Sequence, residues 1–565
     1  MKNKKEPYII ISVVFIGLLV RLFYASYFPI TRDEGAYIYD GLLIKEGFIP
    51  FKDFFTRSPV LIYTLSAFVA VTGKTIFAGR ILSILCSLVS VFLFYLVGKE
   101  LFGKRVAKIA LFLFALLPSA VLQTIYAHTQ PFLIFLLLLA TYLFVVGFKN
   151  KKAAFFILSG LFLGLAILVR HSAAAYLLWE IILLLVLFGE NIQTKAKSSA
   201  FIILGSLLSA LPISAYLISK AGWEKIWLTL GPGLLFRLGA SSESSGGFIQ
   251  ILARQKIPAL FLISEESLLI IFLTIFFLMP FCLCFLKISR KKSKIITLLV
   301  SLVYFALLFI GARKMGIRGE FYTPSVLIPF LAIIWIVIAT KLLDFSKKIK
   351  LKVKQLSFLI PFSFIITPLL SYGLWTKFHP NYFSEFLIGF TLAAAIFLAS
   401  LKVEKMTALL KFSFTILIVA TMFSSVHFAL TLPHTGAFQI KPLYEARDYL
   451  RKNADPEDEI FTSAAIIPFL SGHRLVLNIT HPTIYKYSWI SEDIVAKLGP
   501  TLDDVQNYLE ENKTPWVIVE SSTRSDYFVD RADFYNYIKE NYRLKKTIYN
   551  QIRNTPMPIE IYKRK

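Results

Sequence analysis

The chain has 565 residues, of which 56% are hydrophobic and 15% aromatic, and its mean hydropathy is +0.66. Apolar content of this kind excludes an ordinary soluble globular protein and indicates a polytopic membrane protein of the mainly α fold class. The formal net charge of +26 does not call for a nucleic acid partner, and we expect none. Basic cytoplasmic loops and contacts with anionic membrane lipid or phosphate account for such an excess.

Apolar runs predict about thirteen transmembrane helices within a domain that spans residues 1–430. The runs lie at roughly 8–28, 79–98, 106–125, 131–148, 155–170, 172–189, 200–219, 266–286, 294–312, 323–341, 356–373, 382–401 and 408–430. Basic connectors follow every second span, so the positive-inside rule places them and the N-terminus in the cytoplasm. The sequence therefore predicts a multi-pass protein of the plasma membrane, with its first loop and its C-terminal region outside the cytoplasm.

The first extracytoplasmic loop, residues 29–78, begins with two adjacent carboxylates, Asp33 and Glu34. Charge at the mouth of a span is costly unless it is used, so the pair is a functional-site hypothesis; a solvated acidic pair in a loop is the alternative. An apolar run at 60–71 is too short to cross a bilayer and predicts a helix that lies in the outer interface.

Cations accompany these carboxylates at the predicted outer surface. Arg57 lies in the same loop and Arg80 begins the next span. Arginine binds phosphate oxygens through its planar fork of donors. A carboxylate at the boundary of water and lipid can accept a proton from an incoming hydroxyl. Together these groups suit a reaction in which a lipid-linked phosphate is the leaving group.

The C-terminal region, residues 431–565, has a different composition, with 18 basic and 18 acidic residues. It predicts a small extracytoplasmic α/β domain, because helical and strand-like runs alternate. Helices are predicted at 442–453, 503–512 and 534–541, and strands at 459–462, 515–520 and 559–562. The region has no phosphate-binding loop and no histidine or cysteine spacing typical of a metal site. All three cysteines of the chain lie in apolar runs, so we expect no disulfide and no zinc.

A longer motif surrounds the acidic pair. It reads Arg32-Asp33-Glu34-Gly35-Ala36-Tyr37-x-Tyr39, then Gly47-x-x-Pro50-Phe51-x-Asp53-Phe54-Phe55, then Arg57-Ser58-Pro59-x-x-x-Tyr63. The order, spacing and predicted topology resemble the first loop of the family-39-type membrane glycosyltransferases. These have the class C (GT-C) fold shared by protein O-mannosyltransferases and the aminoarabinose transferases of lipid A. Weaker similarities occur at Arg80–Ser83, Tyr126–Pro131, Gly160–Ala166 and Phe321–Pro324.

The resemblance implies an inverting transfer of a sugar from an undecaprenyl- or dolichyl-phosphate donor, without an essential metal or other cofactor. Asp33 matches the general base of the family, and Glu34 is its neighbour, placed to orient or assist. Arg57 falls where relatives place a basic residue against the donor phosphate, helped by Arg80 or Arg318. The resemblance implies eight further residues of the substrate cavity: Tyr37, Tyr39, Asp53, His128, Arg170, Tyr322, His379 and Tyr382.

Three alternatives stay open at this stage. The loops at 313–322 and 377–382 both match one position of the family. Glu180, within an apolar run, is either a catalytic group or a structural partner of Arg170, and we favour the second. At the level of function, the alternatives to the transferase are a carrier or flippase for lipid-linked glycans that makes no bond, and an inactive relative whose outer domain binds partners. The sugar and the acceptor, whether protein, lipid or glycan, are not specified.

Overall fold

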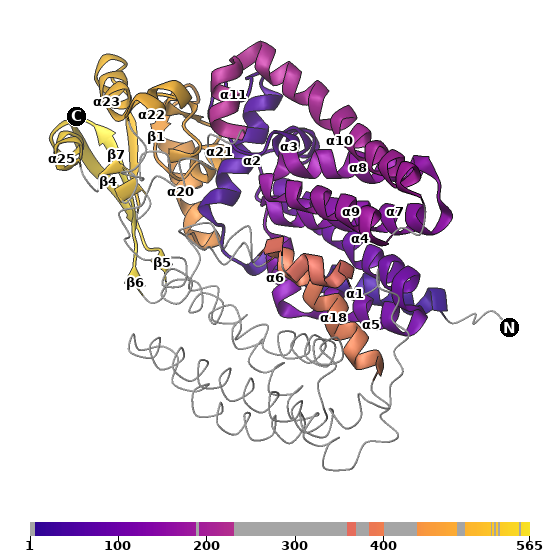
Figure 1. Ribbon diagram of the computed structural model, residues 1–565. Helices are drawn as coiled ribbons and strands as arrows, with labels where there is room; N and C mark the ends of the chain where they lie inside the picture. Colours follow the sequence, from indigo (N-terminus) through magenta and orange to yellow (C-terminus); the bar gives the residue numbers. More distant parts are fainter. Residues whose placement is uncertain are drawn as a thin grey trace, which may run out of the picture.

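The computed structural model describes residues 6–187, 191–230, 359–365, 367–368, 384–400, 438–482, 492–520, 523–524, 527–528, 531–552 and 555–565. Within this part of the chain a mainly helical region is followed by an α/β region, and Figure 1 shows the two side by side. Four of the described helices are long and apolar enough to cross a membrane: Glu6–Tyr27, Phe77–Phe102, Thr129–Asn150 and Ile192–Ala221.

The helices of the first region follow one another with short connections. In chain order they are α1 (Glu6–Tyr27), α2 (Arg32–Lys45), α3 (Pro59–Thr72), α4 (Phe77–Phe102), α5 (Lys104–Leu116), α6 (Pro118–Ile125), α7 (Thr129–Asn150), α8 (Ala153–Val169), α9 (Ala174–Leu187), α10 (Ile192–Ala221) and α11 (Trp223–Leu230). The helix α18 (Phe386–Ser400) packs against α5. The predicted short helix at 60–71 corresponds to α3.

The predicted spans agree with the described helices in most places. The runs at 8–28, 79–98, 131–148 and 200–219 coincide with α1, α4, α7 and α10. The predicted spans at 266–286, 294–312, 323–341 and 408–430 lie outside the described residues, as does half of 356–373. The total of about thirteen transmembrane helices therefore stays a prediction.

The predicted span at 106–125 is interrupted, because the chain forms two helices there. Pro118 has no N–H to donate to the carbonyl of Phe114, so α5 ends at Leu116 and α6 begins at Pro118. The buried guanidinium of Arg21, on α1, occupies this break. It donates to the carbonyl oxygens of Phe114 at 3.0 Å and Ala115 at 2.7 Å. Such helix breaks need a partner for the freed carbonyls at membrane depth.

Helices α8 and α10 pack closely because small residues face each other. A Cβ atom added to Gly160 would collide with the carbonyl oxygen of Ile202, and one added to Gly205 with that of Ile157. Small residues at this spacing let two helix backbones approach in a membrane, where apolar burial alone gives little preference for contact.

We therefore expect Gly160→Val to force α8 and α10 apart and to destabilise the fold by about 1–3 kcal/mol, the usual cost of overpacking. The measurement is the thermal unfolding temperature of the purified protein in detergent. Leu208→Val, on the exposed side of α10, is the matched control and should leave that temperature nearly unchanged. Equal unfolding temperatures for the two variants would contradict the close packing.

The α/β region contains a five-stranded sheet in the order β2-β1-β3-β7-β4. Its strands are β1 (Glu459–Phe461), β2 (Arg474–Leu475), β3 (Trp516–Val519), β4 (Tyr542–Ile548) and β7 (Ile559–Arg564), and a separate pair joins β5 (Gln551–Ile552) to β6 (Thr555–Pro556). Strand β1 is parallel to β2 and β3, whereas β7 is antiparallel to β3 and β4. The described helices of this region are α20 (Ile440–Asn453), α21 (Ile466–Ser471), α22 (Glu492–Leu498), α23 (Leu502–Glu511) and α25 (Ala532–Asn541).

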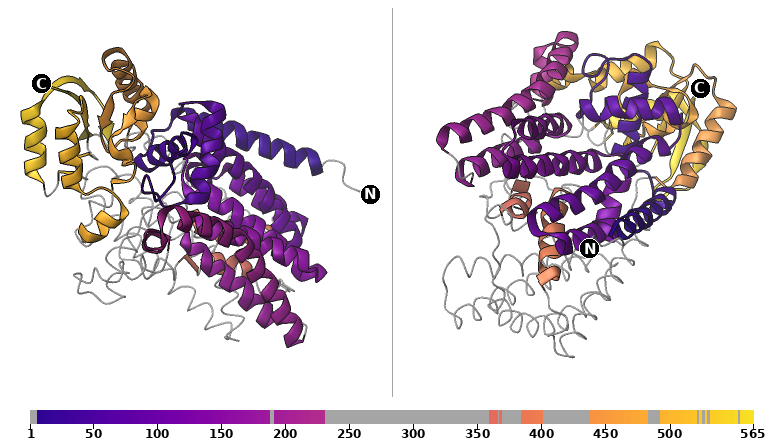
Figure 2. Two further views of the ribbon diagram at one scale, coloured as in Figure 1. Left: turned by 90° about the horizontal axis from the view of Figure 1, so that it is seen from above. Right: turned by 90° about the vertical axis from the view of Figure 1, so that its right-hand side faces the viewer.

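The α/β region docks directly onto α2, and Figures 1 and 2 show α2 between the sheet and the remaining helices. Gly35 lies against Ile466 of α21 so closely that an added Cβ would stand 2.8 Å from the Cβ of Ile466. The Tyr39 hydroxyl accepts a hydrogen bond of 2.7 Å from the backbone N–H of Leu475. One hydrophobic cluster continues from α2 and α3 into the sheet, so the two regions share a core.

Candidate active site

Helix α2 carries the acidic pair in its first turn. Thr31 caps the helix by accepting a hydrogen bond from the backbone N–H of Glu34. Carboxylates in a first turn are stabilised by the positive end of the helix dipole. The helical repeat then separates three faces. Asp33, Tyr37 and Asp40 share one face, whereas Gly35 and Tyr39 share the face that contacts the α/β region.

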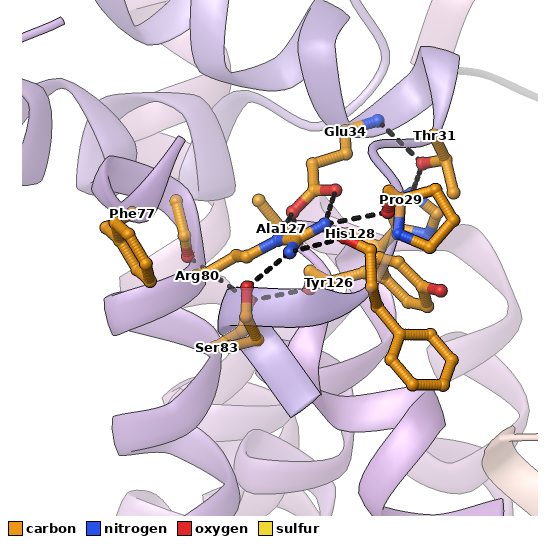
Figure 3. Close-up of polar contacts among 12 residues, drawn as sticks. Pro29, Thr31, Glu34, Phe77, Arg80, Ser83, Tyr126, Ala127 and His128 are labelled. Atoms are coloured by element: carbon orange, nitrogen blue, oxygen red, sulfur yellow. Dashed lines mark hydrogen bonds and ion pairs between the residues drawn. The ribbon is translucent and has the colours of Figure 1, made fainter. Parts of the chain in front are cut away.

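The third face of α2 holds Glu34, which forms a fully buried ion pair with Arg80 of α4 (Figure 3). The two side chains meet in a fork, with Nε–Oε1 at 2.8 Å and Nη2–Oε2 at 2.9 Å. The other N–H groups of Arg80 donate to the backbone carbonyls of Ala25, Phe28 and Pro29. Arginine has five N–H donors, and all five are used here.

This geometry corrects two predicted roles. Arg80 has no N–H group left for a donor phosphate, and its side chain has no exposed surface. Glu34 is equally buried, and its Oε1 also accepts the backbone N–H of Ala127. Neither side chain can reach a substrate, so the structure makes both of them positioning residues. They tie the end of α1, the start of α2 and the turn before α7 together.

Asp33 differs from Glu34, because its side chain is exposed to solvent. Partial desolvation by the surrounding protein raises the pKa of Asp33, but nearby cationic groups outweigh this effect and hold its pKa below the usual value. These groups come from separate segments and are His128, Arg32, Arg57 and His481. Opposite charge favours the ionised carboxylate. Asp33 is therefore an accessible anion, which can accept a proton from a bound group at the moment when that group reacts.

His128 lies beside Asp33 at the start of α7. Its Nε2 is 2.7 Å from Oγ1 of Thr31, the residue that caps α2 (Figure 3). The imidazole is largely buried, and this desolvation lowers its pKa although Asp33 acts in the opposite direction. A lowered pKa keeps the ring neutral at pH 7. His128 therefore lies beside the first turn of α2, which it supports through Thr31, and its role in the substrate cavity stays a prediction.

The same face of α2 continues with Tyr37 and Asp40. Burial, followed by the charge of Asp33, raises the pKa of Tyr37 to about 12, and its hydroxyl contacts Ser58. Asp40 is fully buried, and its Oδ2 accepts a hydrogen bond of 2.7 Å from Thr56. The same oxygen lies 3.0 Å from Nε2 of His481, which follows the sheet strand β2. Asp40 and His481 were not among the predicted site residues, although the spacing of 33, 37 and 40 indicates a common helix face.

Two other predicted cavity residues, Tyr39 and Asp53, form hydrogen bonds with the backbone of the protein. Tyr39 faces the α/β region, with its hydroxyl bonded to Leu475. Asp53 closes a turn of the first loop, because its Oδ2 accepts the backbone N–H of Ile49 at 2.7 Å. Tyr39 is buried in this contact, which corrects its predicted cavity role, whereas the cavity role of the half-buried Asp53 stays a prediction. Sequence position alone could not separate Tyr39 from Tyr37, since the difference arises from the helix face.

Arg57 and Arg170 lie near one another because Ser58, which follows Arg57, donates a hydrogen bond of 2.9 Å to the carbonyl of Val169, which precedes Arg170. Arg57 is exposed, with its guanidinium 6.0 Å from the centre of the Phe55 ring. The chain thus brings Arg170 close to Arg57, which is one of the cationic groups that act on Asp33.

Arg170 pairs with Glu385, whose Oε1 is 3.6 Å from its Nη1. Glu385 is fully buried and also accepts hydrogen bonds from Ser172 and Tyr176. The predicted pairing of Arg170 with Glu180 is therefore wrong. Glu180 instead contacts Ser159 at 2.7 Å and lines a small cavity between the helices. Glu385 was missed because it lies far along the chain from Arg170.

Four predicted site residues, Arg318, Tyr322, His379 and Tyr382, lie outside the described residues. The competition between the loops at 313–322 and 377–382 is therefore not decided. Among the residues that the structure does describe, no group of three or more His, Cys, Asp or Glu side chains could hold a metal ion.

The arrangement of apolar helices, an acidic first loop and a docked α/β region has the fold of the class C membrane glycosyltransferases. Residues 56–218 match the family model described as dolichyl-phosphate-mannose-protein mannosyltransferase. The apo oligosaccharyltransferase of Archaeoglobus fulgidus superimposes with a TM-score of 0.51 at 13% identity, over 92% of this chain and 70% of that one. The resemblance to this fold class is confirmed.

Two further relatives are similar to this chain. ArnT from Cupriavidus metallidurans, solved bound to undecaprenyl phosphate, matches with a TM-score of 0.47 at 11% identity, over 99% of this chain and 98% of that one. YkcB of Bacillus subtilis (strain 168), assigned as a mannosyltransferase by name only, is 26% identical over 233 residues. That match covers 39% of this chain and spans about a third of the relative's length, 32%.

Proposed function

We propose that the chain is an inverting glycosyltransferase that moves a sugar from a polyprenyl-phosphate donor to an acceptor outside the cytoplasm. The observation that carries the proposal is the state of Asp33. It is an exposed carboxylate with a lowered pKa, and cationic side chains of several segments surround it. An accessible anion among cations suits a site where a hydroxyl loses its proton while a phosphate leaves.

In the proposed reaction the acceptor hydroxyl gives its proton to Asp33 as its oxygen attacks the anomeric carbon. The bond between that carbon and the phosphate oxygen breaks, and the bonding electrons leave with the polyprenyl phosphate. Attack from the face opposite the phosphate inverts the configuration. Arg57 binds the phosphate oxygens, and Arg170, held by Glu385, adds positive charge nearby. No metal takes part in this scheme.

The family match at residues 56–218 supports a mannosyl donor, and this is the donor that we propose to test first. We propose that the protein lies in the plasma membrane. Its N-terminus would then be in the cytoplasm, and α2 and the α/β region would be on the outer side. The basic connectors of the sequence support this orientation. The acceptor, whether protein, lipid or glycan, is left open by the proposal.

Replacing Arg57 by alanine is expected to weaken binding of polyprenyl phosphate about tenfold or more, because a hydrogen bond between two charged groups is lost. The measurement is titration of the purified protein with a short-chain polyprenyl phosphate. Arg57→Lys should retain part of the affinity, since it keeps the charge but not the planar fork. Arg105→Ala, in a connector predicted to be cytoplasmic, is the control, and an equal loss in that variant would contradict the assignment.

The reaction itself is tested with the full chain in liposomes and radiolabelled polyprenyl-phosphate mannose. The expected result is release of free polyprenyl phosphate, with the mannose either hydrolysed to the free sugar or transferred to an acceptor. Movement of intact donor across the bilayer, without cleavage, would support the carrier instead and would overturn the proposed transferase.

A further inference from the structure

The α/β region contributes a side chain to the face of α2 that carries Asp33. Nε2 of His481 lies 3.0 Å from Oδ2 of Asp40, and these side chains are 5% and 0% exposed. Thr56 donates to the same carboxylate oxygen at 2.7 Å. Three segments, namely α2, the loop before α3 and the chain after β2, therefore meet at one buried carboxylate.

This contact fixes which ring nitrogen of His481 carries a hydrogen. A carboxylate oxygen can only accept hydrogen bonds, so Nε2 must donate to Asp40. The second nitrogen, Nδ1, is then directed away from Asp40, and its protonation decides whether the ring is neutral or cationic. A histidine held in one tautomer by a carboxylate is the arrangement that orients imidazoles in many enzyme sites.

Aromatic rings hold the imidazole on two sides. The ring of Tyr37 lies 5.3 Å from that of His481 at 62°, and the ring of Phe55 lies 6.4 Å away at 84°. Both contacts are edge-to-face, the geometry that aromatic pairs prefer. The ring of His481 is thus held between Asp40 and Tyr37, on the same helix face as Asp33.

We propose that His481 is a positioning residue of the active site, which fixes the catalytic face of α2 through Asp40. This inference rests on the proposed function, in which Asp33 is the base. The α/β region is then a part of the catalytic unit, although it lies 441 positions from Asp40 in the chain.

Several charged and titratable groups face this pair. Asp33, Tyr37 and Asp40 face it from α2, and Arg57 faces it from the loop before α3. Asp33 also receives the charges of His128 and Arg32. Removal of His481 should therefore raise the pKa of Asp33 toward its usual value but not abolish the lowering, because the guanidinium groups of Arg32 and Arg57 remain.

Two substitutions separate the hydrogen bond from the charge. His481→Gln places an amide N–H near the position of Nε2, so it can still donate to Asp40, but it cannot become cationic. His481→Ala removes both. We expect turnover of polyprenyl-phosphate mannose to fall about tenfold to a hundredfold in the alanine variant, the range for losing a hydrogen bond to a charged group. The glutamine variant should recover most of this loss at neutral pH.

The pH dependence distinguishes positioning from simple structural support. Because the pKa of Asp33 is lowered in the folded state, its stabilising effect is present above the unfolded pKa and is lost as the pH falls through the folded value. In His481→Gln the acid loss of thermal stability should be smaller and should end at a higher pH than in the wild type, and the acid limb of turnover should move to higher pH. In an Asp33→Asn background the same glutamine substitution should shift the stability profile less, because only the pair with Asp40 is then altered.

His473→Gln is the matched control, because His473 is another buried histidine of the α/β region but contacts Ser471. Burial lowers the pKa of His473, so its removal should reduce the loss of stability as the pH falls below about 6.5, the ordinary histidine pKa, and this change should be the same in an Asp33→Asn background. If His481→Gln shifted the stability profile equally in the wild type and in Asp33→Asn, the proposal would be overturned, whatever the activity. The other outcome is a stability profile in which His481 and Asp33 are coupled, in a wild-type protein that does not cleave the donor. That result would keep the positioning role of His481 and overturn the proposed function.

Discussion

Replacing Asp33 by asparagine is expected to reduce sugar transfer at least about a thousandfold, within the range for loss of a general base. The amide is nearly isosteric with the carboxylate but cannot accept a proton at neutral pH. In the structure the side chain is exposed, so the fold does not depend on its charge for a buried contact. The measurement is the rate of polyprenyl phosphate release from polyprenyl-phosphate mannose.

The neighbouring carboxylate supplies the control for this result. Glu34 is buried against Arg80, so Glu34→Gln should lower the thermal unfolding temperature strongly, whereas Asp33→Asn should lower it only slightly at pH 7, by the lost stabilisation of an exposed carboxylate. In the wild type the acid limb of turnover should lie below about pH 3.9, the ordinary pKa of aspartate, because the pKa of Asp33 is lowered. Substantial transfer by the Asp33→Asn protein would remove Asp33 from the mechanism.

Replacing Arg80 by alanine is expected to destabilise the folded protein by about 3–5 kcal/mol, the usual cost of leaving one member of a buried ion pair without its partner. Glu34 would keep its charge in a place without solvent, and three carbonyls at the end of α1 would lose their donors. The readout is the thermal unfolding temperature and the yield of monodisperse protein in detergent.

A double variant tests this explanation of Arg80. Arg80→Met combined with Glu34→Gln removes both charges, so it should be more stable than Arg80→Ala alone. Arg80→Lys should be intermediate, because lysine keeps the charge but has three donors in place of five. If Arg80→Ala unfolded at the temperature of the wild type and bound polyprenyl phosphate more weakly, Arg80 would be a phosphate ligand after all, and the positioning role would be wrong.

Local patterns in the sequence predicted the features that depend on one segment at a time. Long apolar runs located α1, α4, α7 and α10, and the alternation of patterns in the C-terminal region located strands β1, β3 and β7. Strand β4 was missed because its sequence, Tyr-Arg-Leu-Lys-Lys-Thr-Ile, is mostly exposed at the edge of the sheet. Exposed lysines are common on edge strands and conceal the apolar alternation.

The sequence predicted the kinds of side chain that the candidate site contains, but not the role of each residue. The acidic motif pointed to Asp33, but whether a neighbouring charge faces solvent or protein depends on helix faces and on distant partners. Arg80 was misassigned because the backbone carbonyls that bind it are not visible as a sequence motif. His481 and Glu385 were missed for a related reason, since each meets its partner only after hundreds of intervening residues have folded.

The docking of the α/β region onto α2 also sets the order of events during biosynthesis. Asp40 is synthesised 441 residues before His481, which at typical ribosomal speeds is about 20–90 s earlier. During that interval α2 lacks both its histidine and the hydrophobic cover of α21 and the sheet. In a nascent or truncated chain, even one already inserted in the bilayer, the candidate site around α2 is therefore incomplete. The site is complete only once the final quarter of the polypeptide has been synthesised and has packed against α2.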